Sequence, residues 1–248
     1  MSYCPQPLRP FFPFYGSKWN IARYYPHPEH DLIIEPFAGS AGYATFYGWP
    51  RVHLIDADPI IAGVWSYLIR ATPKEILALP LLCEVGSSVD DYAICQEAKW
   101  LIGFWLNRGS ASPKKTRTAY SARTERAQLV WGVRAKQRIA NQLAAIREWT
   151  VTCGSFDIAP SVTATWYIDP PYGDKGKYYR QSFQDFDHLG RWCQDREGLV
   201  VVCENPQATW LPFRTLGDFK TSRGRAHEGV FIQRSLPPPD LFSELGES

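Results

Sequence analysis

The sequence predicts an α/β fold with a mostly parallel sheet. Four apolar runs of strand length are separated by stretches with helical periodicity, and they lie at residues 31–37, 52–56, 166–169 and 199–203. Runs without polar alternation are typical of strands that are covered on both faces, so we expect helices on both sides of the sheet. Two of the runs end in a carboxylate, Asp56 and Asp169.

The first run continues into Ala38-Gly39-Ser40-Ala41-Gly42 and then into an aromatic-rich helical segment. A glycine turn between a strand and a helix lets a ligand approach the backbone closely. The turn lacks the three-glycine dinucleotide fingerprint and a following lysine, so a phosphate cradle is not favoured. Asp56 ends the second run, where doubly wound folds bind ribose hydroxyls. The alternative is a tight connection that binds nothing.

The chain after the second run is predicted to be helical as far as about residue 150. Thr72-Pro73-Lys74-Glu75 supplies a cap residue, a proline at the first helical position and a glutamate at the third, so 59–79 should form two helices. This break marks the expected edge of an inserted helical lobe at 72–149. Residues 1–71 and 150–248 then form the main domain around one core.

Composition argues against several classes of protein. The chain has no apolar run long enough to span a bilayer and no signal-peptide pattern at its start, so we expect a soluble, cytoplasmic protein. The six cysteines show no zinc-type spacing and the five histidines form no cluster. We therefore expect reduced cysteines and no metal site. Nothing in the sequence indicates an obligate protein partner.

Positive charge is concentrated in residues 107–147, which hold ten cationic side chains and one acid, a net charge of +9. Because the whole chain carries +2, the remainder carries −7. A basic region beside an acidic body is typical of a surface that binds duplex nucleic acid, and the loop 110–120 mixes basic, small polar and aromatic residues. A solvated helix face is the alternative. If six of these side chains neutralise phosphates, the log–log salt slope of binding should be roughly −5.

Asp169-Pro170-Pro171-Tyr172 follows the apolar run Trp166-Tyr167-Ile168. The prolines stiffen the backbone and remove its donors, which leaves a rigid corner rich in acceptors. If Asp169 and the Pro170 carbonyl each accept one N–H bond from an exocyclic amine, the nitrogen lone pair is turned toward an electrophile. Tyr172 would stack on the base, which must first be flipped out of a duplex. The alternative is an ordinary turn after a core strand.

Two motifs together carry a resemblance to a known family. Phe37-Ala38-Gly39-Ser40-Ala41-Gly42, placed well before Asp169-Pro170-Pro171-Tyr172, resembles the adenine-N6 DNA methyltransferases of the deoxyadenosine-methylase type, also called the D12 class or group alpha. The resemblance covers nearly the whole chain. It implies a Rossmann-like methyltransferase fold, S-adenosylmethionine as cofactor, duplex DNA as partner and the lobe at 72–149 as the target-recognition segment.

The resemblance also assigns roles to single residues. Phe14-Tyr15-Gly16-Ser17-Lys18 is similar to the family's N-terminal cofactor motif, in which the lysine contacts the methionine end of the cofactor. The implied cofactor-binding set is Phe14, Tyr15, Gly16, Lys18, Glu35, Phe37, Gly39, Gly42, Asp56, Phe156 and Asp169. The implied catalytic set is Asp169, Pro170, Pro171 and Tyr172.

Further residues are implied in DNA binding and in the closing hairpin. Asn107-Arg108-Gly109 resembles a target-recognition motif, and 221–224 with 228–231 is similar to the family's closing hairpin. The predicted DNA-binding set is Asn107, Arg108, Lys114, Lys115, Arg117 and Arg123. Two departures stand out: Ser155 occupies a position that is often acidic in the family, with Asp157 one place late, and Phe14 replaces a frequent tryptophan.

The expected activity is therefore methyl transfer to N6 of a flipped adenine without a metal. Cytosine N4 poses the same geometric problem and stays an alternative, as does an RNA target. A non-catalytic DNA-binding protein that retained the fold is the alternative from another class. The compact size fits a solitary methyltransferase of the kind that phages and prophages carry, and neither the target sequence nor a partner restriction endonuclease can be inferred.

Overall fold

The computed structural model describes residues 6–106, 110–122, 130–172, 185–221 and 224–235. In this part of the chain seven strands form one sheet in the order β3-β2-β1-β4-β5-β7-β6. The strands are β1 Leu32–Glu35, β2 Arg51–Asp56, β3 Thr150–Cys153, β4 Ala164–Ile168, β5 Gly198–Glu204, β6 Arg214–Thr221 and β7 Gly224–Arg234. The first five run parallel, and β7 pairs antiparallel with both β5 and β6. The predicted α/β class with a mostly parallel sheet is confirmed, and the arrangement is compatible with a Rossmann-like fold.

The helices connect the parallel strands. They are α1 Gly42–Tyr47, α2 Pro59–Arg70, α3 Pro73–Ala78, α4 Gln96–Leu106, α5 Ala119–Ala122, α6 Val133–Gln142 and α7 Phe186–Gln194, with 3-10 turns at Ala22–Tyr24, Val89–Asp91, Leu143–Ile146 and Phe156–Ile158. The two helices predicted within 59–79 are confirmed. Their boundary is a capping box: Glu75 N donates to Thr72 Oγ1 at 3.2 Å, and Thr72 N donates to Glu75 Oε2 at 2.7 Å.

All four predicted strands are present with shifted ends, and one parallel strand was missed. β3 pairs only with β2 and lies at the edge of the sheet. Thr150, Thr152 and Cys153 are exposed and Val151 is half-buried. An edge strand with so little covered surface has no apolar run, so hydrophobicity alone does not reveal it.

Both faces of the central strands are buried, as the apolar runs predicted. Successive residues alternate between two cores, because side chains in a strand point to opposite faces. The core under α1 and α2 contains Ile33, Leu54, Tyr167, Leu199 and Val201. The core under α7 contains Ile34, Ile55, Trp166, Val200 and Val202.

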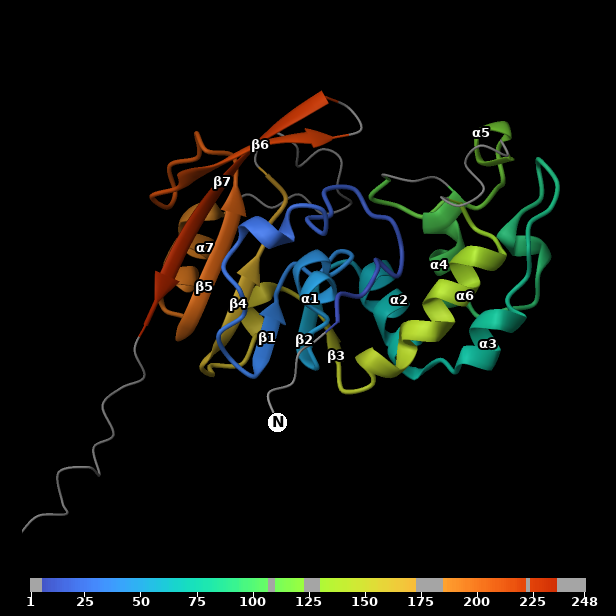
Figure 1. Cartoon of the computed structure of the whole chain (residues 1–248), viewed down its shortest axis with the longest axis horizontal. Helices are drawn as coiled ribbons and strands as arrows, with labels where there is room; N and C mark the ends of the chain where they lie inside the picture. Colours follow the sequence, from blue (N-terminus) through green and yellow to red (C-terminus); the bar gives the residue numbers. More distant parts are fainter. Residues whose placement is uncertain (1–5, 107–109, 123–129, 173–184, 222–223, 236–248) are drawn as a thin grey trace, which may run out of the picture.

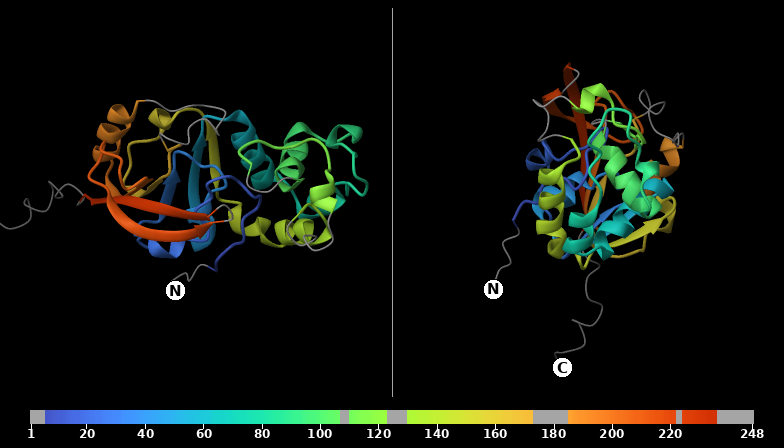
Figure 2. Two further views of the ribbon diagram at one scale, coloured as in Figure 1. Left: turned by 90° about the horizontal axis from the view of Figure 1, so that it is seen from above. Right: turned by 90° about the vertical axis from the view of Figure 1, so that its right-hand side faces the viewer.

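Helices α3, α4 and α6 lie together beside α2, at one end of the molecule, and the β6–β7 hairpin lies toward the other end (Figures 1 and 2). Between β2 and β3 the described residues form helices and turns and no strand of the sheet. Of the described helices, none combines the length and apolar character required to cross a membrane.

The strand order reverses between β1 and β4, because β2 and β3 lie on one side of β1 and β4 and β5 lie on the other. In open α/β sheets, ligands bind beyond the carboxyl ends of the strands at such a switch point. Here β1 ends at Glu35, and Asp169 follows the last residue of β4.

Candidate functional site

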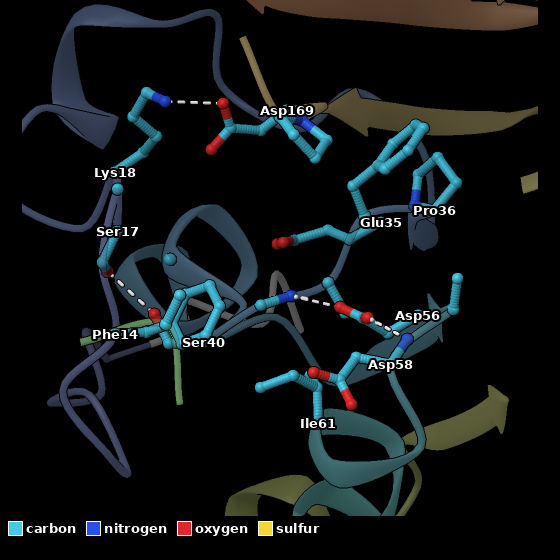
Figure 3. Close-up of a pocket in the computed structure, with 18 of the residues that line it drawn as sticks. Phe14, Ser17, Lys18, Glu35, Pro36, Ser40, Asp56, Asp58, Ile61 and Asp169 are labelled. Atoms are coloured by element: carbon cyan, nitrogen blue, oxygen red, sulfur yellow. Dashed lines mark hydrogen bonds and ion pairs between the residues drawn. The ribbon is translucent and has the colours of Figure 1, made fainter. Parts of the chain in front are cut away.

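A cavity lies at this switch point and holds about 1090 Å³ of space, its open mouth included. Figure 3 shows side chains from the N-terminal segment, the glycine turn, the end of β2 and the start of the tetrapeptide around it. The residues predicted to bind a cofactor all line it: Phe14, Tyr15, Gly16, Lys18, Glu35, Phe37, Gly39, Gly42, Asp56, Phe156 and Asp169. Gly39 and Asp169 therefore face one common space.

Two of the four residues of the tetrapeptide 169–172 line the cavity, and two do not. Asp169 and Pro171 line the cavity, whereas Pro170 is buried and Tyr172 is partly buried beside Lys18. Pro170 and Tyr172 thus do not belong to the cavity wall. The following segment 173–184 lies outside the described residues.

The N-terminal segment packs directly on the start of α1. A Cβ built on Gly42 would lie 2.8 Å from the Trp19 nitrogen and 3.0 Å from the Lys18 nitrogen, which are backbone atoms. Ser40 Oγ donates to Ser17 Oγ at 2.9 Å and joins the same two segments (Figure 3). Gly42 is therefore required because only a residue without a side chain lets the Lys18 segment come this close.

The glycine turn has left-handed backbone at two positions. Gly39 has φ +46°, and a Cβ there would lie 3.1 Å from the Phe14 ring. Ala41 also adopts the left-handed region, with φ 47° and ψ 54°, although it carries a Cβ and is fully buried. Trp65 Nε1 donates to the Gly39 carbonyl at 2.8 Å and holds the turn from the side of α2. The turn is thus fixed by the surrounding core.

Asp56 ties the glycine turn to the end of β2. Its Oδ2 accepts from Gly39 N at 2.9 Å and its Oδ1 accepts from Asp58 N at 2.8 Å (Figure 3). Burial raises the pKa of Asp56 to about 6, although these two N–H bonds oppose the shift. Both oxygens thus already have backbone partners. Asp58, which caps α2 through Ile60 N at 2.9 Å, adds a second carboxylate to the cavity wall.

Glu35 is a buried carboxyl group that points into the cavity between Asp169 and the two aspartates of the β2 end (Figure 3). Ala44 N donates to its Oε1 at 2.7 Å. None of the ion pairs among the described residues includes Glu35. Burial without a counter-ion raises its pKa to about 8. The cavity therefore presents a carboxyl group that a cationic ligand would ionise.

Lys18 lies between two carboxylates. Its Nζ is 2.5 Å from Asp169 Oδ1 and 3.5 Å from Oε1 of Glu228, a buried residue of β7. Burial opposes the charge on Lys18, but the carboxylates outweigh it and hold the Lys18 pKa above its usual range. Burial likewise raises the pKa of Asp169 to about 6, although the ammonium opposes the shift. The cluster thus has one cation for two acids.

Part of the cavity wall is aromatic. The rings of Phe37 and Phe156 stack with centroids 5.7 Å apart. Ser155 lines the cavity next to them, whereas Asp157 is not part of its wall. The Asp157 carboxylate accepts from Ser155 Oγ at 3.1 Å and lies 2.7 Å from His188 Nε2. Asp157, the acid that follows Phe156 instead of preceding it, therefore accepts a hydrogen bond from Ser155 without lining the cavity itself.

The predicted DNA-binding residues are only partly described. Asn107, Arg108 and Arg123 lie outside the described residues. Lys114 is exposed on the loop after α4, and Lys115 is exposed and lies 2.8 Å from Asp90. Arg117 donates to the Leu82 carbonyl instead of standing clear of the protein.

Other cations of the basic region also serve the fold. Lys136 is buried and donates to the Leu79 carbonyl, just after α3. Arg147 donates to the carbonyls of Ile69 and Ala71 at the end of α2, where the helix leaves acceptors unpaired. The count of +9 therefore overstates the charge that this region can offer a partner.

Several site residues were not singled out from the sequence. Ser17, Asp58 and Ala111 line the cavity, and Glu228 contacts Lys18. Asp58 and Ser17 lie close in the sequence to residues that were predicted to line the site, so their positions could have indicated a role there. Glu228 lies in the segment that resembles the family's closing hairpin, which is a weaker indication. No sequence pattern indicates Ala111, because only folding brings its loop to the cavity.

The comparisons with known proteins provide no assignment. A scan against protein-family models finds no match, and a search of curated proteins finds none either. Within the described ranges, no group of three or more His, Cys, Asp or Glu side chains could hold a metal ion.

The Gly42 contact generates a first prediction. Gly42→Ala should destabilise the fold by about 1–3 kcal/mol, because backbone atoms of 18 and 19 must move to admit the methyl group. Gly132→Ala is the matched control, since a Cβ there meets no atom within 4 Å and its backbone is extended at φ 177°. Urea unfolding of both variants measures the difference. Equal, small effects at the two positions would contradict the packing argument.

The buried carboxyl groups generate a second prediction. Glu35 and Asp169 keep their protons to about pH 8 and 6 in the folded protein, whereas in the unfolded chain they ionise near pH 4. Between these limits the folded state binds more protons, so the free energy of unfolding should fall as the pH rises. Glu35→Gln should flatten the decline between pH 6 and 8 in urea unfolding. A variant as pH-sensitive as the wild type would show that Glu35 does not cause it.

Proposed function

We propose that the protein is an S-adenosylmethionine-dependent DNA methyltransferase that transfers a methyl group to N6 of a flipped adenine. The observation that carries the proposal is that Asp169, at the start of a proline-stiffened corner, and the Gly39 turn line one cavity at the switch point of the sheet. Asp169 can accept a hydrogen bond from an amine, and the Gly39 turn can bind a methyl donor beside that amine. The resemblance of these two motifs to the adenine-N6 methyltransferases supports the same reading.

The lining of the cavity fits the cofactor. S-adenosylmethionine supplies, when bound, an electrophilic methyl group on a cationic sulfonium. Among the residues that the structure describes, the cavity wall holds four carboxyl groups, those of Glu35, Asp56, Asp58 and Asp169, and one ammonium, that of Lys18. Burial raises the pKa of Glu35 to about 8, and no ion pair in the described part of the chain includes it, so a cationic ligand would stabilise its ionised form. The stacked rings of Phe37 and Phe156 offer an apolar surface for an adenine.

The tetrapeptide would position the base. An ionised Asp169 accepts an N–H bond from the exocyclic amine, and the rigid Pro170 carbonyl is the second candidate acceptor. Tyr172 offers its ring as a stacking surface. The amine must lose one proton on methylation, and a carboxyl group with a pKa of about 6 can accept it near neutral pH.

We further propose that the region 72–149 is the inserted target-recognition lobe. Its loop reaches the cavity: Tyr15 N donates to the Ser110 carbonyl at 3.3 Å, and Ala111 belongs to the cavity wall. Exposed cations on this loop, Lys114 first among them, would contact phosphates beside the flipped base. Duplex DNA bound there would place its target base at the mouth of the cavity.

The function is tested by incubating the protein with labelled S-adenosylmethionine and unmodified genomic DNA, and with RNA in a parallel reaction, then digesting each nucleic acid to nucleosides. We expect the label in N6-methyladenine. Label in N4-methylcytosine would replace the adenine assignment, and label in RNA alone would replace the DNA assignment.

The role of Asp169 gives a third prediction. Asp169→Ala should lower turnover by a factor on the order of a hundred or more, because a positioned acceptor is lost, and should leave cofactor binding largely intact. Calorimetry with S-adenosylmethionine separates the two effects. Asp185→Ala is a control, since Asp185 is exposed and caps α7. Near-normal turnover of Asp169→Ala would contradict the assignment, and absent cofactor binding by the wild type would favour a non-catalytic protein.

The DNA interface gives a fourth prediction. With about six phosphate contacts the wild type should bind duplex DNA with a log–log salt slope of roughly −5, and Lys114→Ala should reduce its magnitude by about 1. Arg51→Ala, an exposed cation at the start of β2 and outside the region 72–149, is the control and should leave the slope unchanged. Fluorescence anisotropy between 50 and 200 mM salt, roughly the range over which such contacts weaken, measures both. A wild-type slope near zero would remove this region from the interface.

A further inference from the structure

The Lys18 ammonium already makes the two contacts that a target base would need. Its Nζ lies 2.5 Å from Asp169 Oδ1, the proposed acceptor for the substrate amine. It also lies 4.6 Å from the centre of the Tyr172 ring, over the surface proposed to stack on the base. An N–H donor on the carboxylate and a group over the ring are what a flipped base would present. Base and ammonium therefore compete for one position.

A second carboxylate, that of Glu228, lies beside this position. Oε1 of Glu228 is 3.5 Å from Lys18 Nζ, and Glu228 is only 3% exposed. The same oxygen accepts from Tyr25 OH at 3.0 Å and from the Tyr172 hydroxyl. The two hydroxyl groups fix the carboxylate in place, and one of them belongs to the ring that would carry the base.

The Glu228 carboxylate is needed to pair the Lys18 ammonium if a base displaces it from Asp169. A buried ammonium that loses its only partner is strongly disfavoured, so a base could not displace Lys18 from Asp169 without another acceptor nearby. Glu228 supplies that acceptor within the same cluster. A short movement of the side chain would break the ion pair with Asp169 and shorten the existing 3.5 Å contact with Glu228, so the ammonium would stay paired throughout.

We infer that Lys18 holds the place of the substrate amine in the unliganded site, and that Glu228 is the positioning residue that receives the ammonium when the base enters. The inference rests on the proposed function, since it needs an amine that binds Asp169. Glu228 touches neither the base nor the cofactor in this scheme. It acts through Lys18, and through the hydroxyl group that holds the Tyr172 ring.

The test is a double-mutant cycle of Glu228→Gln and Lys18→Met, read as kcat/KM for duplex DNA at saturating cofactor. Gln keeps an acceptor for both hydroxyl groups and removes the charge, so with Lys18 present it should lower kcat/KM about tenfold or more. In the Lys18→Met background no ammonium needs a new partner, and the same change should cost less than twofold. Affinity for S-adenosylmethionine should change less than twofold between the wild type and Glu228→Gln.

Two further variants guard against a purely structural effect. Glu228→Asp keeps the charge and should recover most of the rate, which loss of packing alone would not allow. Asp218→Asn changes an exposed carboxylate of the same hairpin, which pairs with His227 and is not part of the cavity wall, and should act within twofold of the wild type.

The outcomes separate the two proposals. If the wild type transfers methyl groups but Glu228→Gln costs the same in both backgrounds, or Glu228→Asp is as slow as Glu228→Gln, the placeholder inference is wrong and the proposed function stands. If the wild type transfers no methyl group to nucleic acid, the proposed function is wrong and this inference fails with it.

Discussion

The ion pair between Lys18 and Asp169 joins parts of the chain that are 151 residues apart. It holds the N-terminal segment across the carboxyl edge of the sheet, and Gly42 permits that approach because it has no side chain. Glu228 brings the β6–β7 hairpin into the same cluster. Three separate regions of the sequence thus close the cavity around one buried ammonium. Removing its charge would leave two acids facing each other in a site shielded from water.

The same electrostatic imbalance connects structure to function. Burying a carboxyl group is costly, yet Glu35 and Asp169 both line the cavity with pKa values raised by burial. Asp169 pairs with Lys18, whereas no ion pair among the described residues includes Glu35. A cationic methyl donor and an amine that must release a proton are ligands for which such groups are useful. The free-energy cost of burying these carboxyl groups is offset by the two hydrophobic cores that the apolar strands form on either face of the sheet.

Local signals predicted much of this architecture. The capping box at Thr72 and Glu75, and the apolar runs of β1, β2, β4 and β5, depend on neighbouring residues, and each is present. β3 was missed because its edge position leaves little surface to cover. Charge counting was less reliable: Lys136 and Arg147 contribute to the basic sequence region, but both donate to backbone carbonyls at helix ends, and Lys136 is buried.

The sequence by itself determined the fold class and the two motifs that line the cavity, because strand patterning, glycine turns and proline-stiffened corners are written in contiguous residues. Only the tertiary structure decided the pairing of Lys18 with Asp169 and Glu228, the two backbone partners of Asp56 and the arrival of Ala111 at the cavity wall. Those contacts join residues that are far apart in the chain or depend on side-chain direction. Their geometry is fixed by packing, which a linear pattern does not contain.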